Sequence, residues 1–338
     1  MGKQIVQVGM CPILNWPDDY NWGETEKHKT HGGHWENISG LGGVGDEIAM
    51  RLFFQPYTLY RSIKEKYPEF YFKHYSVLHP RQYDKCEYFN PNTVLSLYYH
   101  NPYIDEICGV DPFAIRKEEY YLNGFKEEMK YDDVAEIQWF LKCVKNHMKE
   151  LQKENNEIPL YDIVSSEDFE EDKPHLYLGE ENEKWAENEL KDLPKPIIGI
   201  QTNNTAYSII PYLPLLSKRI KEEMGECSII CVGTHDIPHR WLDNGIISYS
   251  GKTHLLQGIS LIDKFNVFSS FFSGLMYASF IRETPTIVWA DEEKGDSCLG
   301  LVSWYSKNLP IDSNKNEFII SNEIQIEKVV SNIKKFLE

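Results

Sequence analysis

The sequence lacks several features that assign a chain to a class at once. No apolar run reaches the roughly 18 residues of a membrane span, and Met1 to Val6 show no basic segment followed by a long apolar one, as a signal peptide has. The seven cysteines include no pair at zinc-binding spacing, and their odd number does not suggest a disulfide framework. We therefore expect no transmembrane segment and a reducing, cytoplasmic compartment.

Positive charge is scarce as well. The chain has 35 Lys and Arg residues against 52 Asp and Glu residues, which leaves a net charge of −17. An electrostatic field of that sign repels nucleic acid backbones and anionic membranes. We expect nucleic acid not to be a direct partner, although net charge says nothing of how charge is distributed.

The chain does have enough apolar material for sizeable cores. Of its 338 residues, 41% are apolar, including 21 Tyr and 16 Phe, which argues against disorder and fits about two domains. We predict an N-terminal domain over 1–175, with an extension at 1–34, and a C-terminal domain over 190–338. The acidic, proline-ended stretch 163–195 separates them, because the composition shifts there.

Strands and helices alternate in both halves, as in a parallel sheet covered by helices, which predicts an α/β fold. In the N-terminal half we predict strands at 4–9, 35–41 and 69–77, a helix after residue 46, and a short strand after a loop at 101–105. In the C-terminal half we predict strands at 196–201, 227–233, 246–249, 266–270 and 286–290, and helices at 212–224, 253–264, 273–282 and 322–337.

A glycine-rich loop, Gly42-Gly43-Val44-Gly45-Asp46, stands between a predicted strand and a predicted helix. Such a turn lets the backbone approach a ligand and points N–H groups and the positive helix end at it. The pattern is neither the dinucleotide fingerprint nor a P-loop, since the required glycine spacing and a following Lys-Ser/Thr are missing. Asp46 also suits a helix N-cap, so a ligand loop and a simple capped turn both remain open.

Three further stretches carry motifs. They are Asn101-Pro102-Tyr103-Ile104-Asp105-Glu106-Ile107, the Gly-Lys-Thr of 251–253 with the Leu-Ile-Asp-Lys-Phe of 261–265, and the Ser-Gly-Leu-Met of 273–276 with the Thr-Pro-Thr-Ile-Val of 284–288. Together with the glycine loop, whose helix ends in Lys66-Tyr67-Pro68, they resemble in order and spacing the family 9 glycosyltransferases, the heptosyltransferase-like enzymes. The resemblance covers residues 35–110 and 195–290. It implies the GT-B fold, two Rossmann-like domains facing a central cleft.

The resemblance also implies roles. Asp46 matches the family's catalytic base, which would take the proton of the acceptor hydroxyl in an inverting transfer. The donor is a nucleotide sugar held mainly by the C-terminal domain, and the acceptor is a glycan or another hydroxyl compound. With no Asp-x-Asp motif in the sequence, we predict no metal and no cofactor. The candidate binding residues are Gly42, Gly43, Gly45, Thr202, Asn203, Asn204, Thr205, Thr234, Ser273, Gly274, Leu275, Met276 and Tyr277.

The sequence departs from the family at the donor motif. Phe272 stands where the family has an aspartate and Tyr277 where it has a histidine, and Ser208 to Pro211 keep only the proline of a Lys-x-Trp-Pro motif. Two alternatives follow: a binding or scaffold protein with this fold and no chemistry, or a sugar transferase acting on modified DNA. The evenly spaced His28, His31 and His34 are either loop residues or a transition-metal site. The donor sugar, the base and the oligomeric state stay open.

Overall fold

The computed structural model describes residues 4–8, 11–14, 61, 64–65, 68, 71–77, 96–110, 153, 175–203, 210–242, 245–271, 273–290, 313–321 and 325–338. The chain divides into two compact units, one made of Met1–Asp84 and Val94–His175 and the other of Lys85–Thr93 and Leu176–Glu338. Each unit contains a sheet of its own.

The first unit holds a four-stranded sheet in the order β2-β1-β3-β4. Strand β1 pairs antiparallel with β2 and parallel with β3, which pairs parallel with β4. The segment predicted as an extension, 1–34, thus contributes two strands, one of which lies inside the sheet. The predicted strand at 35–41 lies outside the described residues. The strands are β1 (Gln4–Val8), β2 (Cys11–Leu14), β3 (Tyr71–Val77) and β4 (Glu106–Val110).

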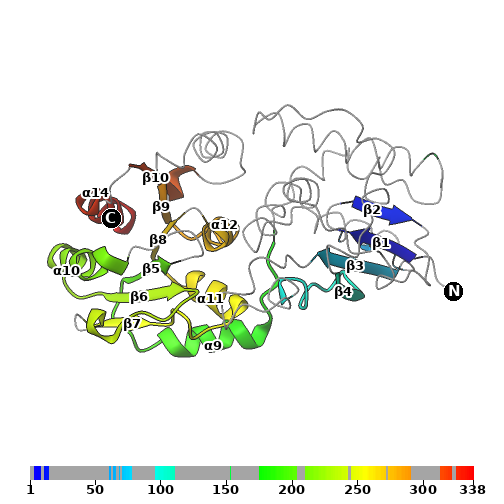
Figure 1. Ribbon diagram of the computed structural model, residues 1–338, viewed down its shortest axis with the longest axis horizontal. Helices are drawn as coiled ribbons and strands as arrows, with labels where there is room; N and C mark the ends of the chain where they lie inside the picture. The colour runs from blue at the N-terminus through cyan, green and yellow to red at the C-terminus, as the bar shows by residue number, and fades with distance from the viewer. Residues whose placement is uncertain are drawn as a thin grey trace, which may run out of the picture. The chain divides into compact units, whose positions relative to one another are not determined.

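The second unit is built on six parallel strands in the order β10-β9-β8-β5-β6-β7 (Figure 1). Counted from β7, the strands follow the order 3-2-1-4-5-6 of doubly wound sheets, which bind ligands at the carboxyl ends where the order reverses. Here the reversal lies between β5 and β8. The strands are β5 (Ile197–Asn203), β6 (Ser228–Gly233), β7 (Ile246–Ser248), β8 (Val267–Phe271), β9 (Thr286–Ala290) and β10 (Asn316–Ile320).

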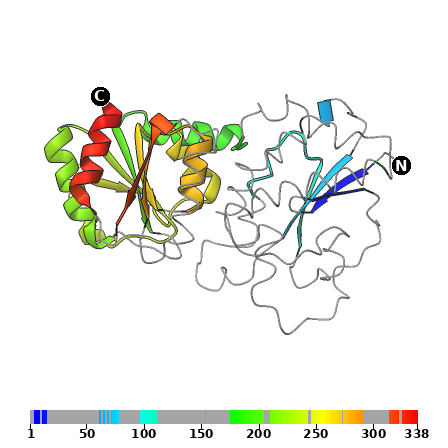
Figure 2. The ribbon, with the colours of Figure 1, turned by 90° about the horizontal axis from the view of Figure 1, so that it is seen from above.

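Helices cover both faces of this sheet (Figure 2). The first face carries α10 (Leu213–Met224) and α14 (Ile326–Leu337), and the second carries α9 (Glu180–Leu190), α11 (Leu255–Ile262) and α12 (Gly274–Ile281). Single 3-10 turns stand at Ile210–Tyr212, His239–Trp241 and Ser313–Lys315. None of the helices in the described ranges has the length and apolar character to cross a membrane.

The strands are apolar on both faces, as buried parallel strands must be. In β5, Ile198 and Ile200 pack with α10 and α14, whereas Ile197 packs with α9 and α11. Gly199 stands between Ile198 and Ile200 in the strand, and a Cβ at this position would lie 2.0 Å from Cδ2 of the buried Phe265. This glycine therefore makes room for the aromatic ring that closes the second face.

Helix α9 is attached to the second unit by an ion pair as well as by packing. The Nε of Arg282, at the end of α12, donates to Asp263 Oδ1 at 2.7 Å, and its Nη2 lies 3.4 Å from Glu183 of α9. Ala186 and Leu190 of α9 are buried in the same core as Phe265. The helix ends at Leu190, where the predicted C-terminal domain starts, and it belongs to this unit.

The predicted strands and helices of the C-terminal half are confirmed, with ends shifted by a few residues. Strands β2 and β10 were not predicted. Strand β2 is a four-residue edge strand that contains Pro12, a residue that weakens a strand pattern, and β10 is a short edge strand that pairs with β9 alone within the described sheet.

We expect Gly199→Ala to lower the free energy of unfolding of the second unit by about 1–3 kcal/mol, because the added methyl must displace the Phe265 ring from a packed core. Urea unfolding followed by tryptophan fluorescence measures the change. Gly258→Ala in α11 is the matched control, since its Cβ would meet Thr253 Oγ1 at 3.7 Å, an ordinary contact. That variant should gain about 0.5–1 kcal/mol. Equal effects in the two variants would contradict the packing account.

Candidate functional site

Polar side chains gather at the carboxyl ends of β5, β6 and β8, the edge where doubly wound sheets bind ligands. Gln201, Thr202 and Asn203 end β5, and all three are buried, with at most 3% of their surface exposed. The pairing of β5 with β6 shifts register between Gln201 and Asn203. The shift leaves Thr202 without a partner in the ladder and redirects the end of the strand, as bulges next to active sites do.

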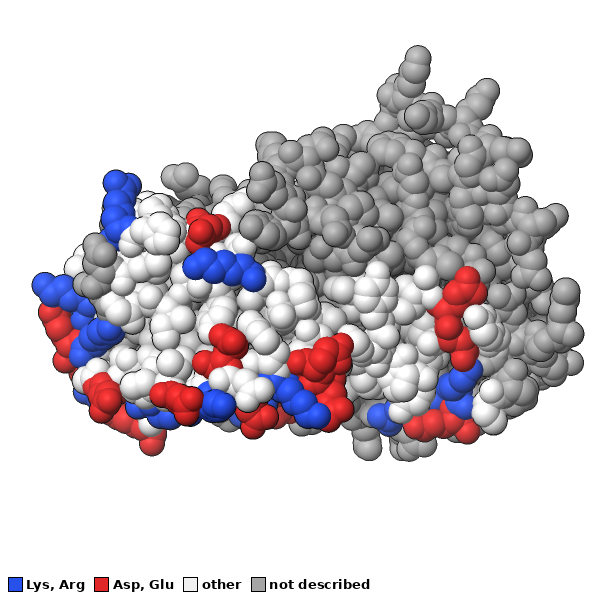
Figure 3. All heavy atoms as spheres, turned by 90° about the horizontal axis from the view of Figure 1, so that it is seen from below, with Lys and Arg blue, Asp and Glu red and all other residues white. Residues whose placement is uncertain are grey.

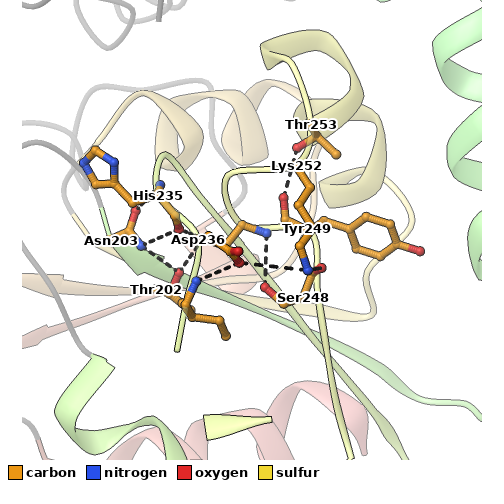
Figure 4. A network of polar contacts seen from close by, with 10 residues as sticks. Thr202, Asn203, His235, Asp236, Ser248, Tyr249, Lys252 and Thr253 are labelled. Carbon is orange, nitrogen blue, oxygen red and sulfur yellow. Dashed lines mark hydrogen bonds and ion pairs between the residues drawn. The ribbon is translucent and has the colours of Figure 1, made fainter. Parts of the chain in front are cut away.

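Thr202 joins β5 to the segment after β7 (Figure 4). Its hydroxyl lies 2.8 Å from Ser250 Oγ and 3.3 Å from the Val232 carbonyl, and Ser250 Oγ donates to the His235 carbonyl at 2.7 Å. Gly233 passes close to these groups, and a Cβ there would lie 2.6 Å from Ser250 Oγ. Only glycine fits at this position, so the end of β6 is built around the network.

Asn203 clamps the loop that follows β6. Its Oδ1 accepts from the His235 backbone N at 3.0 Å and from the Thr234 hydroxyl at 3.1 Å, and its Nδ2 donates to the His235 carbonyl at 3.0 Å. One amide thus satisfies the N–H and the C=O of a single loop residue. Thr202 and Asn203 use their polar atoms inside the protein and fix the loop from Thr234 to Asp236.

The loop presents exposed charged side chains at this edge (Figure 4). The side chain of Asp236 accepts from the Ile237 backbone N at 2.9 Å and lies 3.9 Å from Lys252 Nζ. Lys252, from the Gly-Lys-Thr motif, also donates to the Ser248 carbonyl at 3.2 Å. More than a third of each side chain is exposed, so a ligand can reach both charges.

Two titratable groups flank the Gly-Lys-Thr motif, and the pKa of each is shifted in the direction that favours its neutral form. Burial and the nearby Glu189 raise the pKa of Tyr249, whose hydroxyl donates to Glu189 Oε2 at 2.6 Å. Burial lowers the pKa of His254, at the N-cap of α11. Lys252 therefore supplies the positive charge of this motif.

Gln201 forms a second network across the point of strand reversal. Its Oε1 accepts from Ser270 Oγ of β8 at 2.6 Å and from Ser273 Oγ at 2.8 Å, and its Nε2 donates to the Asn203 carbonyl at 3.3 Å. Ser273 is the N-cap of α12, and its Oγ accepts from the Met276 backbone N at 3.4 Å. A single buried amide therefore ties β5 to β8 and to the start of α12.

The first turn of α12 presents backbone donors at the same edge. The first N–H groups of any helix lack partners within the helix, and Ser273 takes the one of Met276. No described group accepts from the N–H of Gly274 or Leu275, and both residues are only partly buried. Tyr277 is 5% exposed and packs inside the unit. The turn is thus suited to bind an anion through main-chain groups.

The structure brings part of the predicted site together. Thr202, Asn203 and Thr234 form one network, and residues 273–277 form the beginning of α12 at the neighbouring strand end. Gln201, Ser250 and Ser270 were missed, although polar residues at the ends of apolar strands are a usable signal. The predicted residues outside the described part of the chain are Gly42, Gly43, Gly45, Asp46, Asn204 and Thr205, together with Phe272 and the histidines at 28, 31 and 34.

No three His, Cys, Asp or Glu side chains converge as metal ligands within the described ranges. The groups at the sheet edge are hydroxyls, amides, backbone N–H groups and the charges of Asp236 and Lys252. These groups suit hydrogen bonding to a polar, anionic ligand. That the chain works without a metal remains a prediction.

Comparison with known proteins gives a likeness of fold. No protein-family model matches the chain, and no curated protein matches it significantly. The chain is similar to the solved structure of E. coli ADP-heptose LPS heptosyltransferase II, with 14% identity over 87% of this chain and 96% of that one and a TM-score of 0.53. It is also similar to a family 9 glycosyl transferase from Veillonella parvula, with 10% identity over 88% and 95% of the chains and a TM-score of 0.49. The E. coli structure confirms the predicted GT-B fold class.

We expect Asn203→Asp to destabilise the second unit by about 1–3 kcal/mol, because it replaces the amide donor to the His235 carbonyl with a second acceptor. The loop after β6 should also exchange its backbone amide hydrogens faster, which mass spectrometry measures. Asn188→Asp, on the exposed surface of α9, is the matched control and should change stability by less than about 0.5 kcal/mol. Unchanged exchange at 234–236 would contradict the clamp.

Proposed function

We propose that the chain is a glycosyltransferase that transfers a sugar from a nucleotide-sugar donor to a hydroxyl of a glycan or another acceptor. The first turn of α12 carries this proposal. It offers two backbone N–H groups at the strand reversal of a chain that has the fold of a heptosyltransferase. The E. coli neighbour is named for ADP-heptose, and we assign the same chemical class of donor, a nucleoside diphosphate sugar, to this chain.

The diphosphate of the donor would bind at α12. The N–H groups of Gly274 and Leu275 supply donors to its oxygens, and the positive end of the helix dipole favours its charge. When the sugar leaves, negative charge grows on the diphosphate, and fixed donors stabilise it without reorganisation. We therefore propose a transfer that uses no metal ion.

The ribose of the donor would lie at the loop after β6. In doubly wound sheets an acidic residue beyond the second strand binds ribose hydroxyls, and β6 is the second strand of this sheet. Asp236 is the exposed carboxylate at that position, and Lys252 lies 3.9 Å from it. The clamp formed by Asn203 holds the loop in place, so Thr202 and Asn203 support the nucleotide through the loop.

The acceptor side of the reaction is assigned to Asp46. An inverting transfer needs one carboxylate that takes the proton from the acceptor hydroxyl while the anomeric carbon passes through an oxocarbenium-like state. Asp46 follows Gly42, Gly43 and Gly45 in the sequence, and these residues carry no side chain. This assignment rests on the resemblance, since the loop lies outside the described residues.

One observation favours a second candidate, a binding protein of the same fold without chemistry. Tyr277 replaces the histidine of the family's donor motif and is buried, so this position offers no imidazole to the ligand. Binding of a nucleotide sugar without turnover against any hydroxyl acceptor would support this candidate. Transfer to modified DNA gains no support from Figure 3, where acidic and basic side chains of the described residues lie interspersed on the visible face.

A thermal-shift panel of nucleoside diphosphates and nucleotide sugars tests the donor class. A ligand at 100 times its Kd stabilises the folded state by about 2.7 kcal/mol, so the correct donor raises Tm measurably. Nucleoside monophosphates are the control, because they lack the diphosphate that α12 would bind, and they should give a smaller shift. Absence of a shift with every diphosphate compound would overturn the proposed donor class.

We expect Asp46→Asn to lower kcat by roughly 10²–10⁴-fold, the contribution of a positioned general base, while the Kd of the donor stays within about twofold. Turnover is measured as the nucleoside diphosphate released during transfer to the acceptor. Glu47→Gln is the matched control, a neighbouring carboxylate outside the assigned site, and it should keep its turnover. Equal turnover in Asp46→Asn and the unmodified protein would rule out the role of Asp46.

A further inference from the structure

Gln201 has no role in the proposed chemistry, yet it occupies the centre of the candidate site. It is 2% exposed, so it cannot contact a ligand directly to any useful extent. Its amide is nonetheless hydrogen-bonded on both sides of the strand reversal, to Ser270 and Ser273 and to the Asn203 carbonyl. A buried side-chain amide costs free energy unless its polar atoms are hydrogen-bonded. The hydrogen-bond partners of Gln201 therefore indicate which parts of the site it holds in place.

The two serine partners differ in their other hydrogen bonds. The Ser270 hydroxyl has a second acceptor, the Phe271 carbonyl at 2.9 Å, so its proton has an alternative if Gln201 is removed. Ser273 accepts from Met276 N while it donates to Gln201. A continuous chain of hydrogen bonds therefore runs from the first turn of α12 through Ser273 to β5, and such chains strengthen each member.

We propose that Gln201 is the positioning residue of the donor site, which through Ser273 sets the direction in which the first turn of α12 presents its N–H groups to the diphosphate. This inference rests on the proposed function for the identity of the ligand. Gln201 fixes the Ser273 side chain, Ser273 fixes the Met276 N–H, and the N–H groups of Gly274 and Leu275 then point outward together. The strand that carries the clamp residue Asn203 thereby also orients the phosphate-binding turn.

The test compares three variants of the full chain, with inorganic pyrophosphate as the probe. Gln201→Met removes the acceptor at similar volume, and Ser273→Ala removes the link to α12. Ser270→Ala removes the other donor to the same Oε1 and is the matched control. We expect the pyrophosphate Kd to rise about 3–10-fold in the first two, the equivalent of one lost hydrogen bond, and by less than twofold in Ser270→Ala. Ser273→Thr keeps the hydroxyl and should keep the Kd.

A double-mutant cycle separates positioning from general damage. If Gln201 acts through Ser273, then Ser273→Ala in the Gln201→Met background should add less than about twofold, because coupled sites are not additive. Fully additive losses, or equal losses in Ser270→Ala and Ser273→Ala, would overturn the proposal. Should Gln201→Met fail to fold, the comparison of the two serine variants still decides.

A readout without ligand keeps this proposal distinct from the proposed function. With nitrogen-15 methionine labelling, the Met276 amide should exchange its hydrogen several-fold faster in Gln201→Met than in the unmodified protein and remain unchanged in Ser270→Ala. If the unmodified protein binds no pyrophosphate, the diphosphate assignment fails, while the exchange rate still tests the coupling from Gln201 to α12. Unchanged Met276 exchange in Gln201→Met would refute that coupling.

Discussion

The second unit depends on how its sheet reverses strand order between β5 and β8. The strands that follow β5 in the chain lie on one side of it and those that follow β8 lie on the other, and the pairing of β5 with β6 is irregular between Gln201 and Asn203. Buried polar groups need hydrogen-bond partners. At this edge of the sheet, the last three residues of β5 provide many of these hydrogen bonds. Gln201 bonds toward β8 and α12, whereas Thr202 and Asn203 bond toward β6 and its loop. Both halves of the candidate site are therefore anchored to three consecutive residues.

Periodicity was sufficient to predict five of the six strands of the second unit, but neither β10 nor the polar edge of the sheet. Apolar runs such as Ile197 to Ile200 mark buried strands, and Pro and Gly mark their ends, so strand positions follow from the sequence. Which strands are neighbours does not follow from the sequence, because β5 pairs with β8, more than 60 residues further along the chain. The polar network needs that neighbour relation, and this is why Thr202 and Asn203 were predicted as ligand contacts and Ser270 and Gln201 were missed.

The burial of Thr202 and Asn203 changes the interpretation of polar residues at strand ends from ligand contacts to supporting residues. From sequence alone, hydroxyl and amide groups at the carboxyl edge look like ligand donors. In the structure their hydrogen-bonding capacity is used by Ser250, Thr234 and the His235 backbone. Such residues determine where the loop and its exposed Asp236 lie, and under the proposed function they support the ligand through that loop. The distinction between contact and support requires burial, which composition and spacing do not contain.

At the start of α12, the sequence departs from the donor motif of the glycosyltransferases that it resembles. Tyr277 stands where that motif has a histidine, and it is buried, so no imidazole is available at this position. The backbone N–H groups at the start of α12 remain, and under the proposed function their strength as an anion site depends on their direction more than on charge. A site of that kind is only as good as the rigidity of its first turn. The bond from Ser273 to the buried Gln201 supplies that rigidity from the centre of the sheet, which gives this otherwise unexplained glutamine a reason to be there.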